Sequence, residues 1–457
     1  MLILIVATSM TYADSTPEGT PISTAEQLFA IQENGIYYLA NDIDLSAYPD
    51  KVIENTFKGT IDGNGYKITN FTMTKSREFG GDFAGLFLLT NNATFKNLTL
   101  ENVNIDIQLT TDYAKVGAVT PDAVDCTFSN VKVSGKINLT CISTEKQCMV
   151  GGIFGIANSN ITITGCENAV DISVNGVDSV EVSGLGSFNI ASFVEVSNCK
   201  NSGNITVIKT GIGDTDVAGL IAFGRQGNGL TMKSCKNTGD ITVNIPQNLK
   251  CSYSYDVAGV CTYAEEIFKC SNTGTVKVAG KLANSYIYVA GISIGDANKI
   301  DQSYNTGKIY VNASSAPEIV TMAGIYAASR TYGRSLYVKN SYNIGKIIYK
   351  GKTNSKKSPT YIMSGIVGRT DDYKVSCCYN TGTITGPKQA RTGAIVQERY
   401  EGKISNNYYT KGANKFKSSQ VKKVTKITKS QCPKLSSKYW VYSKAKGRMI
   451  LKNNKEK

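Results

Sequence analysis

The feature that most constrains this chain is an internal repeat with a period of about 35 residues. Each copy begins with a short apolar run that ends in Ala-Gly, and about fifteen residues later it continues with a small residue, an Asn and a Gly. The clearest copies start at Val217, Val257 and Val289. Periods of roughly 20–50 residues are typical of stacked supersecondary units. The repeat therefore predicts that the 457 residues form one long array and not several independent domains.

Asparagine occupies the same place in seven successive copies, at steps of 33, 36, 35, 33, 38 and 37 residues. The seven positions are Asn168, Asn201, Asn237, Asn272, Asn305, Asn343 and Asn380. Coils stacked in register bring equivalent residues to about 4.8 Å from one another. We therefore expect the seven amides to stack as a structural ladder. The Gly that stands two residues after most of them would turn the corner without a Cβ.

A small side chain stands two residues before each of these asparagines. The positions are Cys166, Cys199, Cys235, Cys270, Ser303, Ser341 and Cys378. An apolar residue precedes each of them by three positions, as Met232 precedes Cys235, whereas alternation along a strand gives a spacing of two. The spacing predicts a bend. Equivalent Cβ atoms would lie about 4.8 Å apart and a disulfide prefers about 3.8 Å, so we expect mostly free, buried thiols.

The strand pattern predicts the fold class. Each copy contains three short strand-like segments: one after the Gly, one that runs into Ala-Gly and one before the Asn. No copy has the four hairpin-linked strands of a propeller blade or the helical half of a leucine-rich repeat. We therefore predict an all-β, right-handed parallel β-helix of about ten coils over residues 51–410.

The two ends of the array are expected to be capped. Residues 14–50 would supply the first strands and a short helix, with Ser23 as N-cap and Glu26 at the third helical position. Residues 411–457 would form a basic cap and tail. Within this tail, two apolar segments around Gly447 predict a hairpin that covers the last coil.

Several features predict a secreted or cell-surface protein. Residues 1–13 combine an apolar core with small residues before Asp14, which is typical of a signal peptide cleaved after Ala13. No other stretch approaches the ~18 apolar residues that span a bilayer, so we expect no transmembrane segment. In a secreted chain, Cys141 and Cys148 are the best candidates for a disulfide. Seven sequons would accept N-glycans in a eukaryotic host and arise by chance in a bacterial one: Asn70, Asn92, Asn97, Asn138, Asn160, Asn204 and Asn312.

The net charge of +14 resides in the C-terminal tail. Residues 411–457 contain 15 Lys and Arg and one Glu, whereas residues 1–410 contain 35 basic and 35 acidic residues. A neutral body argues against nucleic acid as the partner. The tail is suited to an anionic surface such as an acidic polysaccharide, lipid head groups or nucleic acid. The alternative is that the lysines only keep a solvated terminus soluble.

Little in the sequence indicates chemistry. The chain has no His, which excludes the Ser-His-Asp triad and the His-Glu-x-x-His zinc site. It has no Cys-x-x-Cys pair, so we expect no metal and no cofactor. The acids examined for a catalytic pair are Asp42, Asp44, Asp62, Glu265, Glu266, Asp371 and Asp372. A polysaccharide-cleaving groove would repeat its acids over adjacent coils, and we expect these acids to fall out of register.

Residues from about 20 to 452 resemble the GLUG-repeat proteins, a family of secreted or surface-displayed β-solenoids. The resemblance rests on the opening Ile22–Leu28, on Tyr38–Leu45, on Phe57–Gly65 and on the Gly-Gly-Ile-Phe-Gly motif at 151–155. In that family the repeats occur beside immunoglobulin-A-cleaving protease domains and in adhesin-like proteins. This chain contains no such protease domain, so the resemblance implies only the binding or display part.

We therefore expect a non-enzymatic, adhesin-like or structural module that binds a polysaccharide, another anionic surface or a protein receptor. Two alternatives remain: a polysaccharide lyase or hydrolase of the β-helix type, and a passive spacer or coat protein.

Overall fold

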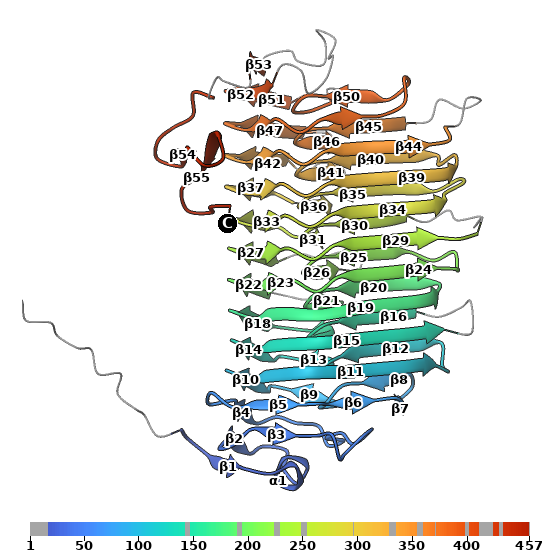
Figure 1. Ribbon diagram of the computed structural model, residues 1–457, viewed down its shortest axis with the longest axis vertical. Coiled ribbons are helices and arrows are strands. Elements are labelled where there is room, and N and C mark those ends of the chain that lie inside the picture. The colour runs from blue at the N-terminus through green and yellow to red at the C-terminus, as the bar shows by residue number, and fades with distance from the viewer. Residues whose placement is uncertain are drawn as a thin grey trace, which may run out of the picture.

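The computed structural model of the protein describes residues 17–141, 147–189, 194–223, 229–247, 254–295, 297–328, 335–353, 360–370, 372–397, 402–410, 424–428 and 433–456. The chain is 58% strand and 1% helix, and its parallel sheets form a β-solenoid of about 9 turns (Figure 1). The predicted parallel β-solenoid is confirmed, with about one turn fewer than expected.

Four sheets run along the solenoid axis. We number them 1 to 4 in the order in which one coil visits them. Sheet 1 contains β1 (Thr20–Ile22), β2 (Ile36–Leu39), β4 (Thr60–Asp62), β10 (Thr94–Lys96), β14 (Thr127–Ser129), β18 (Ile161–Thr164), β22 (Val194–Ser197), β27 (Leu230–Lys233), β32 (Glu266–Phe268), β37 (Lys299–Asp301), β42 (Ser335–Lys339), β47 (Asp372–Ser376) and β51 (Gly402–Ser405).

Sheet 2 contains the asparagines and the strands that follow them: β3 (Ile43–Asp44), β5 (Lys67–Thr69), β6 (Thr72–Met73), β11 (Thr99–Leu109), β15 (Lys132–Cys141), β19 (Glu167–Val177), β23 (Lys200–Asn201), β24 (Ile205–Lys209), β28 (Lys236–Asn237), β29 (Ile241–Ile245), β33 (Ser271–Asn272), β34 (Val276–Lys281), β38 (Tyr304–Asn305), β39 (Ile309–Ser315), β43 (Tyr342–Asn343), β44 (Ile347–Gly351), β48 (Tyr379–Asn380), β49 (Ile384–Thr385), β52 (Asn407–Thr410) and β53 (Val424–Ile427).

Sheet 3 runs into the Ala-Gly phrase: β7 (Arg77–Glu78), β8 (Asp82–Ala84), β12 (Tyr113–Gly117), β16 (Gln147–Gly151), β20 (Ser179–Ser183), β25 (Thr215–Ala218), β30 (Ser254–Ala258), β35 (Tyr286–Ala290), β40 (Ile319–Ala323), β45 (Thr360–Ser364) and β50 (Arg391–Gly393). Sheet 4 follows the phrase: β9 (Thr90–Asn91), β13 (Thr120–Val124), β17 (Phe154–Asn158), β21 (Gly186–Phe188), β26 (Ile221–Phe223), β31 (Cys261–Tyr263), β36 (Ser293–Gly295), β41 (Tyr326–Ala328) and β46 (Val367–Arg369).

The expectation of three strands per coil was wrong, because the Ala-Gly phrase is itself a bend. From β13 on, the short strand of sheet 4 begins only two or three residues after the glycine of the phrase, as β26 begins at Ile221 after Gly219. Such three-residue strands are too short to be recognised from alternation alone.

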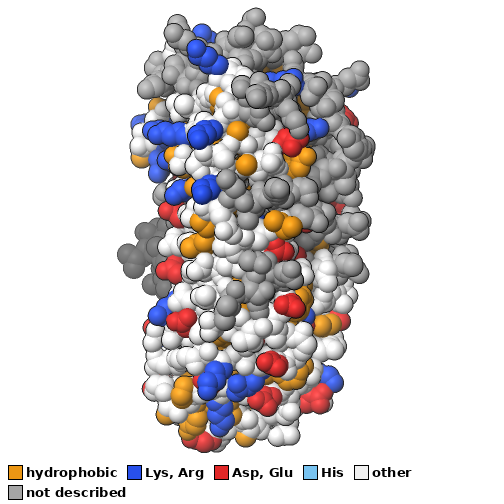
Figure 2. Space-filling view, turned by 90° about the vertical axis from the view of Figure 1, so that its right-hand side faces the viewer, with side chains coloured by type: hydrophobic (Ala, Val, Ile, Leu, Met, Phe, Trp, Pro, Cys, Tyr) orange, Lys and Arg blue, Asp and Glu red, His pale blue; other side chains and the backbone are white. Residues whose placement is uncertain are grey.

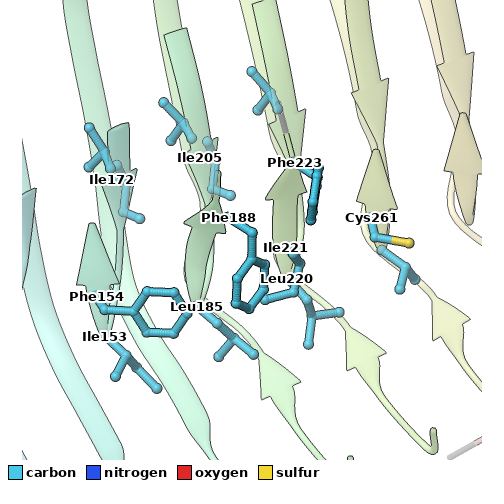
Figure 3. Close-up of a cluster of buried hydrophobic side chains, with 14 of the residues drawn as sticks. Ile153, Phe154, Ile172, Leu185, Phe188, Ile205, Leu220, Ile221, Phe223 and Cys261 are labelled. Carbon is cyan, nitrogen blue, oxygen red and sulfur yellow. The ribbon is translucent and has the colours of Figure 1, made fainter. Parts of the chain in front are cut away.

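Apolar side chains fill the interior as stacks along the axis. Rings follow one another from Phe57 to Phe223, with adjacent centroids 5.0–6.1 Å apart. Figure 3 shows Phe154, Phe188 and Phe223 on successive coils, and Cys261 on the coil after them. Each aromatic contact contributes about 0.5–1.5 kcal/mol beyond the burial of its area.

A single left-handed residue makes the bend between sheets 1 and 2. It stands immediately before the small residue: Ser234 has φ 57° before Cys235, and Cys377 has φ 56° before Cys378. One residue in this conformation reverses the alternation, which explains the observed spacing of three. The bend predicted from the spacing is present.

The seven asparagines form an unbroken ladder. Each Nδ2 donates to the Oδ1 of the next asparagine at 2.8 Å, from Asn168 through to Asn380. The side chains are buried, with at most 1% of their surface exposed. From Asn201 to Asn380, Nδ2 also donates to the carbonyl oxygen of the Gly two residues later, at 2.9–3.2 Å.

Glycine rows on two sides make room for this ladder. A Cβ added at Gly219 would lie 2.4 Å from Asn237 Cγ, so the Ala-Gly bend of a coil leaves the space that its own asparagine fills. A Cβ added at Gly239 would lie 1.9 Å from the carbonyl oxygen of Gly203 on the preceding coil. The glycines after the asparagines are therefore required by close approach of adjacent backbones.

The cysteines of the corner row are free and buried, as predicted. Cys141 and Cys148 are also buried, and their Sγ atoms lie 3.9 Å apart. This is contact distance and is well beyond the ~2.0 Å of a disulfide bond.

The N-terminal helix α1 (Ala25–Phe29) covers the first coil with Leu28, which is fully buried. Its N-cap is Thr24, whose Oγ1 accepts a hydrogen bond from the Gln27 amide at 3.3 Å. The expected start at Ser23 was therefore wrong by one residue. The Ser23 amide instead donates to Gln27 Oε1 at 2.7 Å.

The C-terminal hairpin has a different place from the expected one. β54 (Trp440–Ser443) and β55 (Arg448–Leu451) pair antiparallel around Gly447, but they lie beside the solenoid and not over its last coil (Figure 1). We name residues 433–456 the C-terminal strap. Above the solenoid, β53 lies on β52 as a further parallel strand.

The strap packs on a tyrosine strip, which comprises Tyr304, Tyr342, Tyr379 and Tyr408. Three of these rings stack at 5.0 and 4.9 Å with planes within 9°. Trp440 lies 5.8 Å from the Tyr342 ring and 5.6 Å from the Tyr379 ring. The strap also accepts hydrogen bonds from the tyrosine hydroxyls. The Met449 carbonyl oxygen accepts one from the Tyr379 hydroxyl at 2.6 Å. The apolar hairpin therefore packs on the aromatic strip at the flank and not on the end of the solenoid.

We predict that Asn272→Ala destabilises the solenoid. The change leaves Asn305 Oδ1 and the Gly274 carbonyl without their Asn272 bonds, and each buried unpaired group costs about 1–3 kcal/mol. Urea unfolding followed by circular dichroism measures the loss. Asn312→Ala, on the exposed face of β39, is the matched control and should change stability by less than about 0.5 kcal/mol. Equal losses in the two variants would contradict a structural role of the ladder.

We predict that Trp440→Ala releases the strap and leaves the solenoid folded. Truncating a buried Trp costs about 3–5 kcal/mol, and Trp440 is the largest side chain of the small cluster that holds the strap. Limited trypsin digestion should then cut the strap faster while the circular dichroism stays unchanged. Tyr442→Ala is the control, because Tyr442 is an aromatic residue of the same strand that is 48% exposed. Equal cleavage of both variants would refute docking through Trp440.

Candidate functional site

The acids considered in the sequence are engaged in local structure. Asp44 Oδ1 accepts from the Ser46 amide at 2.9 Å and from Asn70 Nδ2 at 2.8 Å, and these hydrogen bonds, that from Asn70 foremost, lower the pKa of Asp44. Asp42, Asp62 and Glu265 likewise accept hydrogen bonds from backbone amides. Glu266 pairs with Lys299 at 3.5 Å, Asp372 bonds Ser335, and Asp371 lies outside the described residues. The described members of this set therefore stabilise turns and strand rows.

A different set of acids does stand in register. Glu181, Asp216 and Asp256 are direct partners on β20, β25 and β30 of sheet 3. The next residue on each strand is a core valine, so alternation directs the three acids away from the core. Asp216 is 6% exposed and Asp256 is fully buried. These three acids are not among those considered in the sequence, and they stand on three adjacent coils.

The sequence carried a signal for this row. In three consecutive repeats an acid precedes the valine of the Ala-Gly phrase, in Glu181–Gly184, Asp216–Gly219 and Asp256–Gly259. The acid stands immediately before the apolar run that marks the repeat. Strand register then places the three carboxylates on adjacent coils about 4.8 Å apart.

The acid row lies where the outer faces of sheets 3 and 4 turn toward each other. Tyr263 of sheet 4 donates its hydroxyl to Asp256 Oδ2 at 2.8 Å, and Ser187 Oγ donates to the Glu181 carbonyl at 3.3 Å. Farther along the same bend, Ala258, Ala290, Ile294 and Ala327 form a buried apolar cluster separate from the core, with Tyr288 packed against it. Both sheets therefore contribute to a concave, largely buried strip.

The electrostatics of this strip are negative around the acids. Burial raises the pKa of Tyr113 to about 12, with further contributions from the charges of Asp122 and Glu181. Lys115 forms an ion pair with Asp122 on the same bend. Among the described residues, no group of three or more Cys, Asp and Glu side chains is arranged to hold a metal ion. The strip therefore holds three carboxylates in register, of which Asp256 accepts a hydrogen bond from the Tyr263 hydroxyl.

The array is neutral in total but strongly polarised along its axis. Residues 1–298 contain 19 basic and 29 acidic residues, a net charge of −10, whereas residues 299–410 contain 16 basic and 6 acidic residues, a net charge of +10. Figure 2 shows Lys and Arg on the C-terminal part of one face and a second group of them near the N-terminal end, where most Asp and Glu of this face lie. The equal numbers of basic and acidic residues over residues 1–410 do not reveal this division.

Individual rows of side chains follow the same trend. On sheet 2, the residues after the corner glycines are Asn204, Asp240 and Thr275, then the basic Lys308 and Lys346, and last Thr383. In the N-terminal part of this row, Asn204 Oδ1 accepts from the Asp240 amide and Asp240 Oδ1 from the Thr275 amide. In the C-terminal part, Lys308 and Lys346 are exposed.

The seven sequon asparagines all lie at accessible positions. Asn92, Asn97, Asn160, Asn204 and Asn312 are exposed, and Asn70 and Asn138 are partly exposed. Glycosylation of these residues stays a prediction. The predicted signal peptide lies outside the described residues. No helix in the described part of the chain is long and apolar enough to cross a membrane.

Comparison of the sequence with known protein families and with curated proteins found no match. The resemblance to the GLUG-repeat proteins therefore stays a prediction.

Proposed function

We propose that this protein is a secreted or surface-displayed, adhesin-like β-solenoid that binds an anionic polysaccharide through its C-terminal end. The observation that carries the proposal is the axial charge division, with −10 before residue 299 and +10 from there to residue 410. A localised positive surface attracts polyanions and orients the long body relative to them. The acidic half would then point away from the anionic matrix.

The strap adds its charge to the same end. It packs on the coils of Tyr304 to Tyr408, and it contains Lys434, Lys438, Lys444, Lys446, Lys452 and Lys455. Its one acid, Glu456, is paired with Arg448. Docking of the strap therefore concentrates the positive charge of the tail beside that of the C-terminal coils.

We predict that the full-length protein is retained on immobilised polygalacturonate and dextran sulfate at low salt, and not on neutral dextran. Salt should release it, because the Debye length falls to about 3 Å at 1 M. The triple variant Lys308→Gln, Lys346→Gln and Lys350→Gln should elute at lower salt than the wild type.

The matched control replaces Lys58, Lys132 and Lys136, which belong to N-terminal coils, by Gln. It removes the same charge from the acidic half and should elute with the wild type. Absence of retention at low salt, or equal weakening by the two triple variants, would refute the proposal.

A second function, cleavage of a polysaccharide, is favoured by the acid row alone. Neighbouring coils place its members about 4.8 Å apart and Glu181 about twice that from Asp256, which brackets the ~5–9.5 Å between catalytic carboxyls of glycoside hydrolases. The Tyr263 hydroxyl adds a proton donor that already contacts Asp256.

This second function predicts new reducing or unsaturated ends when the wild type is incubated with neutral or acidic polysaccharides. Asp256→Asn should lower the rate by about 10²-fold or more, because it removes an acid–base group. Asp240→Asn, on the exposed face of sheet 2, should leave the rate unchanged. If the wild type produces no new ends, the enzymatic function is excluded and the binding function is unaffected.

A further inference from the structure

A groove opens on the outer face of sheet 1 at the C-terminal end. It has a volume of about 460 Å³ and is lined by Ser335, Tyr337, Asp372, Tyr373, Lys374, Gly402 and Lys403. These residues come from β42, β47 and β51, the last three strands of the sheet. The volume lies within the ~300–1,000 Å³ range of ligand pockets.

We propose that this groove is a binding subsite for one or two units of an anionic polysaccharide, with Tyr337 as the stacking platform and Lys374 and Lys403 as the anion contacts. The inference rests on the proposed function and names the place and the chemistry of recognition. It assigns specific recognition to the sheet and not to the lysines of the tail.

The floor of the groove is fixed by packing. Tyr373 is 3% exposed, and its ring lies directly below Gly402, where an added Cβ would come within 2.4 Å of three ring atoms. Tyr373 alternates with the exposed Asp372 and Lys374 and belongs to the core, so its packing fixes the position of β47 beneath the groove.

The wall presents an exposed ring beside an ammonium group. Tyr337 is 48% exposed, and Lys374 Nζ lies 5.9 Å from the centre of its ring. The apolar face of a pyranose ring packs well on an aromatic side chain, and a carboxylate or sulfate on the same sugar then lies within reach of the lysine. Ser335 and Asp372, which bond each other, offer polar groups to sugar hydroxyls.

The charged residues of the groove belong to one row along the axis. The strand register places Lys299, Tyr337, Lys374 and Lys403 on four successive strands. Lys299 pairs with Glu266 below it. For Lys374 and Lys403, no ion pair with a described carboxylate is present. Successive members are about 4.8 Å apart, which is close to the length of one pyranose unit, so a chain lying along the axis meets one member per sugar.

The N-terminal part of the same row serves as an internal comparison. There the equivalent residues are Thr60, Thr94, Thr127 and Thr162, which form direct partners on β4, β10, β14 and β18. They offer neither a ring nor a positive charge. The groove is therefore a local departure from the repeat, confined to the basic end.

A polysaccharide fits the groove better than a single-stranded nucleic acid. Nucleic-acid binding uses successive aromatic platforms along a uniformly positive track. Here one exposed ring stands in the row, and Asp372 lies two residues before Lys374 on the same face. The carboxylate repels a phosphate backbone but accepts hydrogen bonds from sugar hydroxyls.

The test measures binding of the full-length protein to oligogalacturonate and to sulfated dextran oligomers by calorimetry at low and high salt. Tyr337→Ala should weaken binding about tenfold at both salt concentrations, because stacking does not depend on screening. Lys374→Gln with Lys403→Gln should weaken binding about tenfold at low salt, with a smaller effect at high salt.

Matched controls remove similar groups elsewhere. Phe79→Ala removes an aromatic residue that is 47% exposed, and Lys96→Gln with Lys233→Gln removes two charges from strands of sheet 1 outside the groove. Both controls should bind like the wild type. Circular dichroism of every variant verifies the fold.

The outcomes distinguish failure of the proposed function from failure of the subsite. If the wild type binds no anionic polysaccharide, the proposed function and the subsite both fail. If the wild type binds and the groove variants bind equally well, only the subsite is refuted. Equal affinity for neutral oligosaccharides, or tighter binding of a single-stranded oligonucleotide that is lost in the same variants, would refute the assigned ligand class.

Discussion

The asparagine ladder is the interaction on which the rest of the solenoid depends. Its amides need a partner on every coil, because an unpaired buried amide costs about 1–3 kcal/mol. The 2.8 Å bonds from Asn168 to Asn380 are possible only when adjacent coils stack in strict register. Glycines on both sides of the ladder bring the backbones close enough, as Gly219 does for Asn237. A ladder of this kind fixes the register of four sheets at once.

Fixed register converts the outer surface into rows of side chains with a common spacing. A row acquires a chemical character of its own only when several consecutive repeats carry the same unusual type of residue at the same position. Glu181, Asp216 and Asp256 form such a row on sheet 3, and Tyr337, Lys374 and Lys403 form another on sheet 1. The first lies in a concave, buried bend and the second on an open face. Their different surroundings separate a candidate for chemistry from a candidate for binding.

The two ends of the solenoid are covered in different ways. At the N-terminus, α1 covers the open core of the first coil, and Leu28 packs where the side chains of a preceding coil would otherwise lie. At the C-terminus, the hairpin leaves the axis and packs along the flank, where stacked tyrosines present a wide apolar strip. Trp440 buries its ring there, and the hydroxyls of the strip bond the strap. The basic tail thereby becomes part of the folded body.

The sequence by itself determined the repeat, the parallel solenoid, the corner and the asparagine ladder, because each depends on a spacing that recurs along the chain. Only the tertiary structure decided which residues of different coils lie next to one another. It showed that the acids before Val182, Val217 and Val257 share one face, that the Ala-Gly phrase is a bend, and that the hairpin around Trp440 docks on tyrosines. These features join residues about 35 to 140 positions apart. The stacking of coils, and not the local sequence, brings them together.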